Sequence, residues 1–148
     1  MESSPTRVLI VASQTAATDG LLEAVRERAA RGPCRFTLLV PTPVTAVQRL
    51  LNPDDADRAQ ATAVLERALP PLSEAAGSPV AGRVGVPEPL AAIQDAVNLL
   101  GFDEIIISTL PHRVSRWLHL DLPHKAAGLG LPVTTVTASG RDREPAAV

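Results

Sequence analysis

The chain has 148 residues, 45% of them hydrophobic and 20% charged, and its formal net charge is -2. This composition indicates one globular domain with a buried core and excludes a disordered chain. Aromatic residues make up only 2% of the chain and basic residues are not in excess. We therefore expect no nucleic-acid partner, because base stacking needs aromatic platforms and a phosphate backbone needs a basic surface.

The cysteine content and the lack of long apolar stretches bear on the compartment. The single cysteine, Cys34, excludes a disulfide within the chain and fits a reducing environment. No apolar stretch approaches the roughly 18 residues of a membrane span, and the polar N-terminal residues lack the pattern of a secretion signal. We expect a cytoplasmic protein that has no membrane partner.

Five segments have the length and composition of β-strands. The runs around Val8 and Ile105 are continuously apolar, which is typical of strands buried on both faces at the centre of a parallel sheet. The segment around Arg83 contains glycines and the last segment is rich in threonine, so both are expected at the edges. The predicted strands are residues 7–13, 35–40, 80–86, 103–109 and 133–138.

Helical patterns alternate with these strands. Thr18 or Asp19 is expected to cap the first helix, which ends at Gly32, and a later helix over residues 87–100 is expected to end at Gly101. The longest helix is predicted over residues 54–76, but Pro70 and Pro71 should kink or end it, because proline lacks the amide that a helix needs. A short turn of helix is expected within residues 44–51, and a last helix over residues 122–129, capped by Asp121.

The alternation of strands and helices predicts an α/β fold. Parallel strands joined by right-handed helical crossovers give a five-stranded parallel sheet in the order 3-2-1-4-5, with helices on both faces. Residues 1–138 are expected to form this single domain, and the polar residues 139–148 a disordered tail.

In this strand order the winding of the chain reverses between the first and fourth strands. Ligands of such sheets bind beyond the carboxyl ends of the strands at that switch point. Three strands deliver residues there, so the candidate ligand-binding residues are Ala12, Ser13, Gln14, Val40, Pro41, Ser108 and Thr109.

A strand, a polar loop, a short helix and a final strand preceded by Leu131 and Pro132 close the chain. In this order of elements, over residues 7–138, the chain resembles the universal stress protein family. The resemblance implies a sandwich of the universal-stress-protein type (adenine nucleotide alpha hydrolase-like). It also suggests a homodimer formed through the edge strand Val133–Thr137, and an exposed edge strand is chemically suited to pairing with its symmetry mate.

Nucleotide-binding members of that family carry glycines in the loop after the fourth strand, and the amides of these glycines approach the phosphates. The matching positions here are Ser108, Pro111 and the pair Asp121 and Leu122. None is glycine, Pro111 has no amide hydrogen, and Asp121 would place negative charge near a phosphate. An aspartate that ATP-binding members often carry at the end of the first strand is also replaced, by alanine or serine. We therefore expect neither the usual ATP site nor any cofactor.

Arg113 and Arg116 leave a second interpretation open. Two guanidinium groups at a switch point could hold a phosphate or a carboxylate with their side chains, and Asp121 follows in the same segment. The alternative is therefore ATP or AMP binding through a divergent loop; otherwise the two arginines are ordinary solvated residues. Trp117 is expected to anchor this loop to the domain or to a partner rather than to stack on a base.

Other reactive residue types in this region form no recognisable motif. His112, His119 and His124 lack the spacing at which ligands converge on a metal, so no metal site is expected. Ser108 or Ser115 with a neighbouring histidine has the residue types of a small serine hydrolase, which stays a further alternative, but no nucleophile elbow surrounds either serine. We expect a regulatory or interaction domain without catalytic residues.

Overall fold

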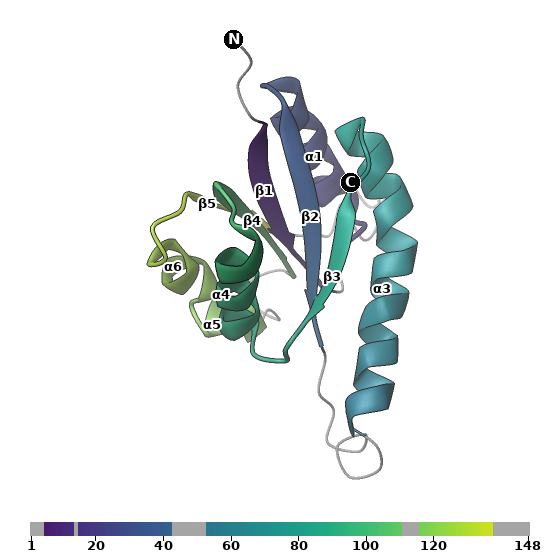
Figure 1. Ribbon diagram of the computed structural model, residues 1–148, viewed down its shortest axis with the longest axis vertical. Helices are drawn as coiled ribbons and strands as arrows, with labels where there is room; N and C mark the ends of the chain where they lie inside the picture. Colours follow the sequence, from purple (N-terminus) through teal and green to yellow (C-terminus); the bar gives the residue numbers. More distant parts are fainter. Residues whose placement is uncertain (1–4, 14, 43–52, 111–115, 138–148) are drawn as a thin grey trace.

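A parallel sheet lies at the centre of the molecule (Figure 1). The structure is a computed structural model, and it describes residues 5–13, 15–42, 53–110 and 116–137. The strands are β1 Thr6–Val11, β2 Cys34–Pro41, β3 Ala81–Gly85, β4 Glu104–Thr109 and β5 Val133–Thr137. Their order is β3-β2-β1-β4-β5, and every neighbouring pair is parallel, which confirms the predicted topology.

Helices pack against both faces of this sheet (Figure 1). The described helices are α1 Asp19–Ala30, α3 Pro53–Ala76, α4 Pro89–Leu100, α5 Arg116–His119 and α6 Leu122–Ala127. Leu21 of α1 and Leu72 of α3 enter a hydrophobic cluster on one face. Ile93 of α4 and Leu122 of α6 enter a second cluster on the other face. The sheet is therefore the middle layer of three.

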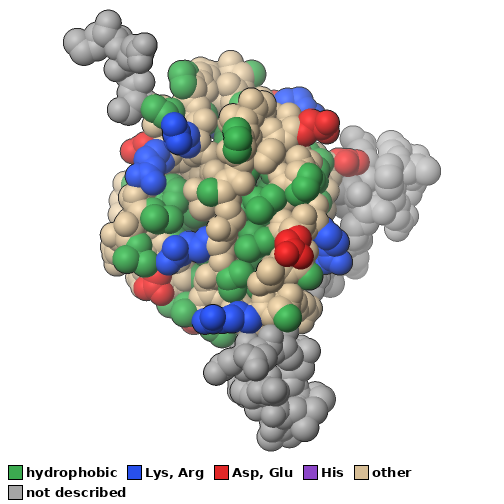
Figure 2. All heavy atoms as spheres, turned by 45° about the vertical axis from the view of Figure 1, so that its right-hand side comes forward, with side chains coloured by type: hydrophobic (Ala, Val, Ile, Leu, Met, Phe, Trp, Pro, Cys, Tyr) green, Lys and Arg blue, Asp and Glu red, His purple; other side chains and the backbone are tan. Residues whose placement is uncertain are grey.

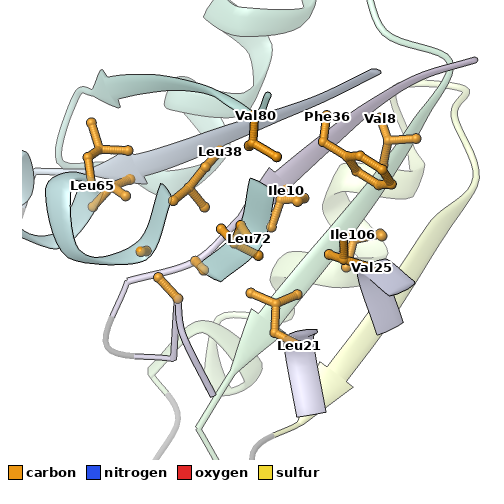
Figure 3. Packing of buried hydrophobic residues seen from close by; sticks show 14 of the residues in the cluster. Val8, Ile10, Leu21, Val25, Phe36, Leu38, Leu65, Leu72, Val80 and Ile106 are labelled. Atoms are coloured by element: carbon orange, nitrogen blue, oxygen red, sulfur yellow. The ribbon is translucent and has the colours of Figure 1, made fainter. Parts of the chain in front are cut away.

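Alternate residues of the central strand β1 point to the two faces. Val8 and Ile10 belong to the cluster under α1 and α3, whereas Leu9 and Val11 belong to the cluster under α4 and α6, and all are 0% exposed. Figure 3 shows the first cluster, to which strands and helices both contribute. Burial on both faces explains the continuous apolar run of this strand and its central place.

The ends of α1 and α4 confirm two predicted caps. Thr18 Oγ1 accepts a hydrogen bond from Leu21 N at 3.5 Å, at the start of α1. Gly101 follows α4 with a φ of 78°, and its N–H donates to Val97 O. A positive φ is the conformation that glycine adopts without a steric penalty.

Helix α3 continues through Pro70 and Pro71 to Ala76, so its predicted span is confirmed and the prolines do not end it. Each proline withholds the hydrogen bond that the carbonyl four residues earlier would accept. The carbonyls concerned belong to Glu66 and Arg67, which are exposed, so water can satisfy them. Beyond the prolines Leu72 is 0% exposed, and its burial helps to hold the last turns of the helix.

Strands β3 and β5 form the edges of the sheet, as predicted. Figure 2 shows apolar side chains interspersed with polar and charged ones on the side that it draws. Across the described ranges, no helix is long and apolar enough to cross a membrane. The expectations for residues 44–51 and 139–148 fall outside the described residues.

Candidate functional site

The candidate site lies at the carboxyl ends of β1 and β4. These strands are neighbours, with Val11 paired to Ile107. Beyond that pair the chain turns to opposite faces, because α1 follows β1 on one face while α6 follows β4 on the other. Where the chain diverges in this way, a parallel sheet forms a binding crevice beyond the carboxyl ends of its strands.

A hydrogen bond between two buried hydroxyl groups joins these strand ends. Thr15 Oγ1 and Ser108 Oγ are 2.6 Å apart, and the two residues are 2% and 1% exposed. Ser108 Oγ also lies 3.4 Å from Thr15 O, to which it can donate. The sequence predicts Ser108 as a site residue but misses Thr15, whose only signal is its position in the turn after β1.

Thr109 carries a buried hydroxyl that has no hydrogen-bond partner among the described residues. Thr109 is 2% exposed and points away from Ser108, because successive side chains of a strand alternate. It therefore shares the face of Ile107, which packs in the cluster with Leu122 of α6. An unpaired buried hydroxyl lowers the stability of a protein by about 1–3 kcal/mol. Thr109 Oγ1 is therefore an unsatisfied polar atom at the end of β4.

Buried apolar residues also lie at the ends of β1 and β2. Ala12 is 0% exposed, and its N–H donates to a β2 carbonyl at 3.2 Å. Val40 and Pro41 are buried at the end of β2. Thr42 Oγ1 donates to a β3 carbonyl at 2.6 Å, which ties the end of β2 to its neighbour.

Several predicted site residues cannot be placed against these atoms. Gln14 and Arg113 lie outside the described residues. Arg116 is the first residue of α5, but its side chain is outside that description. Ser13 is half-buried just beyond β1. The convergence of two guanidinium groups on this site therefore stays a prediction.

Asp121 occupies the position before α6, but it does not cap the helix with its side chain, so that part of the prediction is wrong. Its φ of 58° is left-handed, whereas a side-chain cap requires an extended backbone at that residue. The carboxylate instead lies 3.3 Å from His124 Nδ1, with both side chains largely exposed. In these described contacts, Asp121 bonds to neither Ser108 nor Thr109.

Helix α5 was not predicted, and it follows the loop directly. It contains Trp117, which is half-buried and packs against the cluster that includes Leu122 and Ala126. This packing confirms Trp117 as an anchor to the domain, since a large aromatic side chain gains most from burial of its ring.

An ion pair lies at the opposite end of the strands, at the start of β4. Arg28 Nε and Nη2 donate to the two carboxylate oxygens of Glu104 at 2.9 and 3.0 Å. This hydrogen bonding raises the pKa of Arg28, and burial raises the pKa of the Cys34 thiol beside the pair. A thiol with a raised pKa stays protonated at neutral pH, so Cys34 is not an activated nucleophile.

The described side chains do not assemble a metal centre or a catalytic triad. No group of three histidine, cysteine, aspartate or glutamate side chains comes together in the described part of the chain. The hydrogen-bond partner of Ser108 is Thr15. Nucleophilic serine chemistry needs a base bonded to the hydroxyl, and no histidine occupies that place among the described residues.

Solved structures of other proteins share this architecture. A universal stress protein family protein from Burkholderia pseudomallei is 21% identical, with a TM-score of 0.63, over 93% of this chain and 100% of that one. An Arabidopsis thaliana family protein with AMP bound is 15% identical, with a TM-score of 0.63, over 97% of both chains. The Archaeoglobus fulgidus universal stress protein in complex with dAMP is 17% identical, with a TM-score of 0.59, over 92% of this chain and 99% of that one.

No protein-family model matches the sequence, and no curated protein matches it. The structural matches nevertheless extend over nearly the whole chain, with TM-scores of 0.63. The chain therefore has the fold of the universal stress proteins.

Proposed function

We propose that this chain is a universal-stress-protein-like regulatory or interaction domain that does not bind ATP through a glycine-rich loop. The observation that carries the proposal is the buried hydrogen bond between Thr15 and Ser108. It joins the ends of β1 and β4 at the switch point, and Ser108 is the position at which the family resemblance expects the first glycine of the loop.

Side-chain chemistry at the strand ends supports this proposal. Ser108 stands where the first glycine of the family loop is expected, and its side chain is turned into the protein toward Thr15. The aspartate that ATP-binding members often carry at the end of the first strand is replaced by Ala12, which is 0% exposed, or by Ser13. Pro111, at the second glycine position, has no amide hydrogen to donate. Pro111 thus lacks an amide donor, and neither Ala12 nor Ser13 carries a carboxylate that could accept a hydrogen bond.

Thermal unfolding with and without nucleotides tests the proposal. We expect ATP, AMP, cAMP and dAMP at about 1 mM to leave the melting temperature unchanged, whereas a ligand at 100 times its dissociation constant stabilises a protein by about 2.7 kcal/mol. Guanosine nucleotides serve as the matched control for non-specific anion effects. A saturable shift with an adenine nucleotide alone would overturn the proposal.

Nucleotide binding through a divergent loop is the second candidate, and the unpartnered hydroxyl of Thr109 favours it. A bound ligand at the end of β4 could supply the missing hydrogen bond. Structures with the same fold are described with AMP, cAMP or dAMP bound. If an adenine nucleotide shifts the melt, Arg113→Ala with Arg116→Ala should abolish the shift, and Arg67→Ala on α3 should not.

We further propose a cytoplasmic homodimer formed through β5. Ile105 N donates to Pro132 O at 2.9 Å, and Ile105 is paired with Val133. In a parallel ladder this register turns the backbone groups of Thr134 toward β4 and those of Thr135 away from the sheet. The outer edge of β5 thus presents free donors and acceptors to a second copy.

A further inference from the structure

Among the described residues, no helix covers the first residues of β2 and β3 on the face of the sheet where α4 and α6 pack (Figure 1). Leu39 of β2 packs in the cluster of that face, and a Cβ added at Gly85 of β3 would meet Ala92 of α4. Side chains two residues apart on a strand share a face. The open part of this face, which we call the arginine face, therefore consists of Arg35, Thr37, Ala81 and Arg83.

The two arginines of this surface carry charges that no described carboxylate neutralises. Neither guanidinium takes part in an ion pair or side-chain hydrogen bond among the described residues. Arg35 is exposed and Arg83 is half-buried. Both guanidinium groups are therefore available to an anionic partner.

The spacing of the two arginines follows from the register of the sheet. Arg83 is paired with Leu39, four residues beyond Arg35 on the neighbouring strand, which separates the two positions by about 13 Å along the strands. Thr37 and Ala81, which lie between them, are paired with each other and have short side chains. The surface between the two charges is therefore low enough for another backbone to approach.

An exposed leucine borders the arginine face. Leu99 is 68% exposed and follows Ala92 by two turns of α4, which places both on the same side of the helix. Ala92 is the residue that packs against β3. The helical spacing thus puts an exposed apolar side chain on the side of α4 that is turned toward β3.

We propose that the arginine face docks an acidic, extended segment of a partner protein, with an apolar side chain of that segment against Leu99. Carboxylates four residues apart in an extended chain are separated by about 13 Å, which matches Arg35 and Arg83. Two cations would neutralise too few phosphates to hold a nucleic acid, and the negative net charge of the chain opposes one. The inference gives a partner class to the proposed interaction role, but it uses a surface other than the switch point.

Nuclear magnetic resonance titration of the full chain tests the proposal. The probe is a short peptide of glutamates with one central leucine, and a peptide with lysine in place of glutamate is its control. We expect chemical-shift changes on Arg35, Thr37, Ala81 and Arg83 with the acidic peptide only. Arg35→Glu with Arg83→Glu should weaken binding about tenfold, because two attractions become repulsions.

Arg67→Glu is the matched control, because Arg67 is exposed on α3, which packs on the other face. It should change the affinity for the acidic peptide by less than about twofold. The proposal is overturned if the peptide does not bind, if it shifts residues elsewhere, or if Arg67→Glu weakens it as much as the double variant. A single-stranded oligonucleotide that binds more tightly than the peptide, through the same arginines, would replace the acidic protein segment as the occupant. A negative titration does not bear on the thermal-unfolding test with nucleotides, because the arginine face and the switch point are different surfaces.

Discussion

The hydrogen bond between Thr15 and Ser108 joins residues that lie 93 positions apart in the chain. Both hydroxyl groups are buried, so each depends on the other for the partner that water would otherwise supply. The bond ties the turn after β1 to the end of β4 at the point where the fold would hold a ligand. One contact therefore bears on both the stability of the domain and the shape of the candidate site.

Removing one of the two hydroxyl groups should lower the free energy of unfolding by more than the net contribution of the hydrogen bond, because the other hydroxyl is left without a partner. Ser108→Ala is expected to lower the free energy of unfolding by about 1–3 kcal/mol, because Thr15 Oγ1 is then buried without a partner. Thr15→Val with Ser108→Ala should cost less than the sum of the two single changes. Urea denaturation of the four proteins measures this coupling.

Thr109→Val is the matched control for these hydroxyl deletions. Since Thr109 Oγ1 has no partner among the described residues, its removal should leave the unfolding free energy unchanged or raise it. A loss of about 1 kcal/mol or more would show that this hydroxyl is hydrogen-bonded after all.

For individual residues, the sequence predicts where the site lies better than it predicts which side chains contact one another there. Ser108 and Thr109 could be placed because residues at the end of an apolar strand must arrive at the switch point. Thr15 could not, because a hydrogen bond across 93 residues leaves no local pattern. The side-chain directions of Arg113 and Arg116 also depend on tertiary contacts, and they remain predictions.

Among the elements, β3 and α4 approach each other closely at Gly85. A Cβ built on Gly85 would lie 2.8 Å from Ala92 Cβ and 2.9 Å from Leu39 Cδ1. Ala92 Cβ has no rotatable bond with which to move aside, so the helix itself would have to shift. On the other face, a Cβ built on Gly82 would meet the end of the Leu69 side chain at 2.9 Å, which can rotate away.

Gly85→Ala should therefore destabilise the fold more than Gly82→Ala. We expect Gly85→Ala to lower the unfolding free energy by about 1–3 kcal/mol, as overpacking of a core does. Gly82→Ala should cost less than about 1 kcal/mol, since a flexible side chain can yield. Thermal melts of the two variants compare them directly, and equal losses would contradict the close packing of β3 on α4.

The types of the elements follow from local patterns, whereas their ends depend on what surrounds them. Apolar runs and helical periodicity predict the described strands and every described helix except α5. The continuation of α3 past Pro70 and Pro71 depends on the burial of Leu72 in the core. The short helix α5 depends on the anchoring of Trp117. Neither anchor is visible without the fold.

For the molecule as a whole, the free edge of β5 governs how copies could associate. Thr135 directs its backbone groups outward, and Thr134 directs its own toward β4, by the register of the parallel ladder. A proline at Thr135 would remove a backbone donor that faces a second copy, whereas a proline at Thr134 would remove one that faces β4.

Thr135→Pro should convert the proposed dimer to a monomer with little loss of fold stability. Proline is tolerated in an edge strand where the missing N–H faces solvent. Thr134→Pro should instead lower the melting temperature, because it removes a hydrogen bond to β4. Sedimentation at micromolar concentration and a thermal melt read out the two effects. A protein that sediments as a monomer before any substitution would contradict the dimer.

The central place of β1 has a consequence for synthesis of the chain on the ribosome. One edge of β1 pairs with β2, which emerges soon afterwards, but the other pairs with β4, whose residues Glu104–Thr109 are made much later. Between these events the most apolar strand of the nascent chain has an unpaired edge. Such edges recruit other chains. The nascent domain is therefore most vulnerable to aggregation from the completion of β2 until β4 has left the exit tunnel.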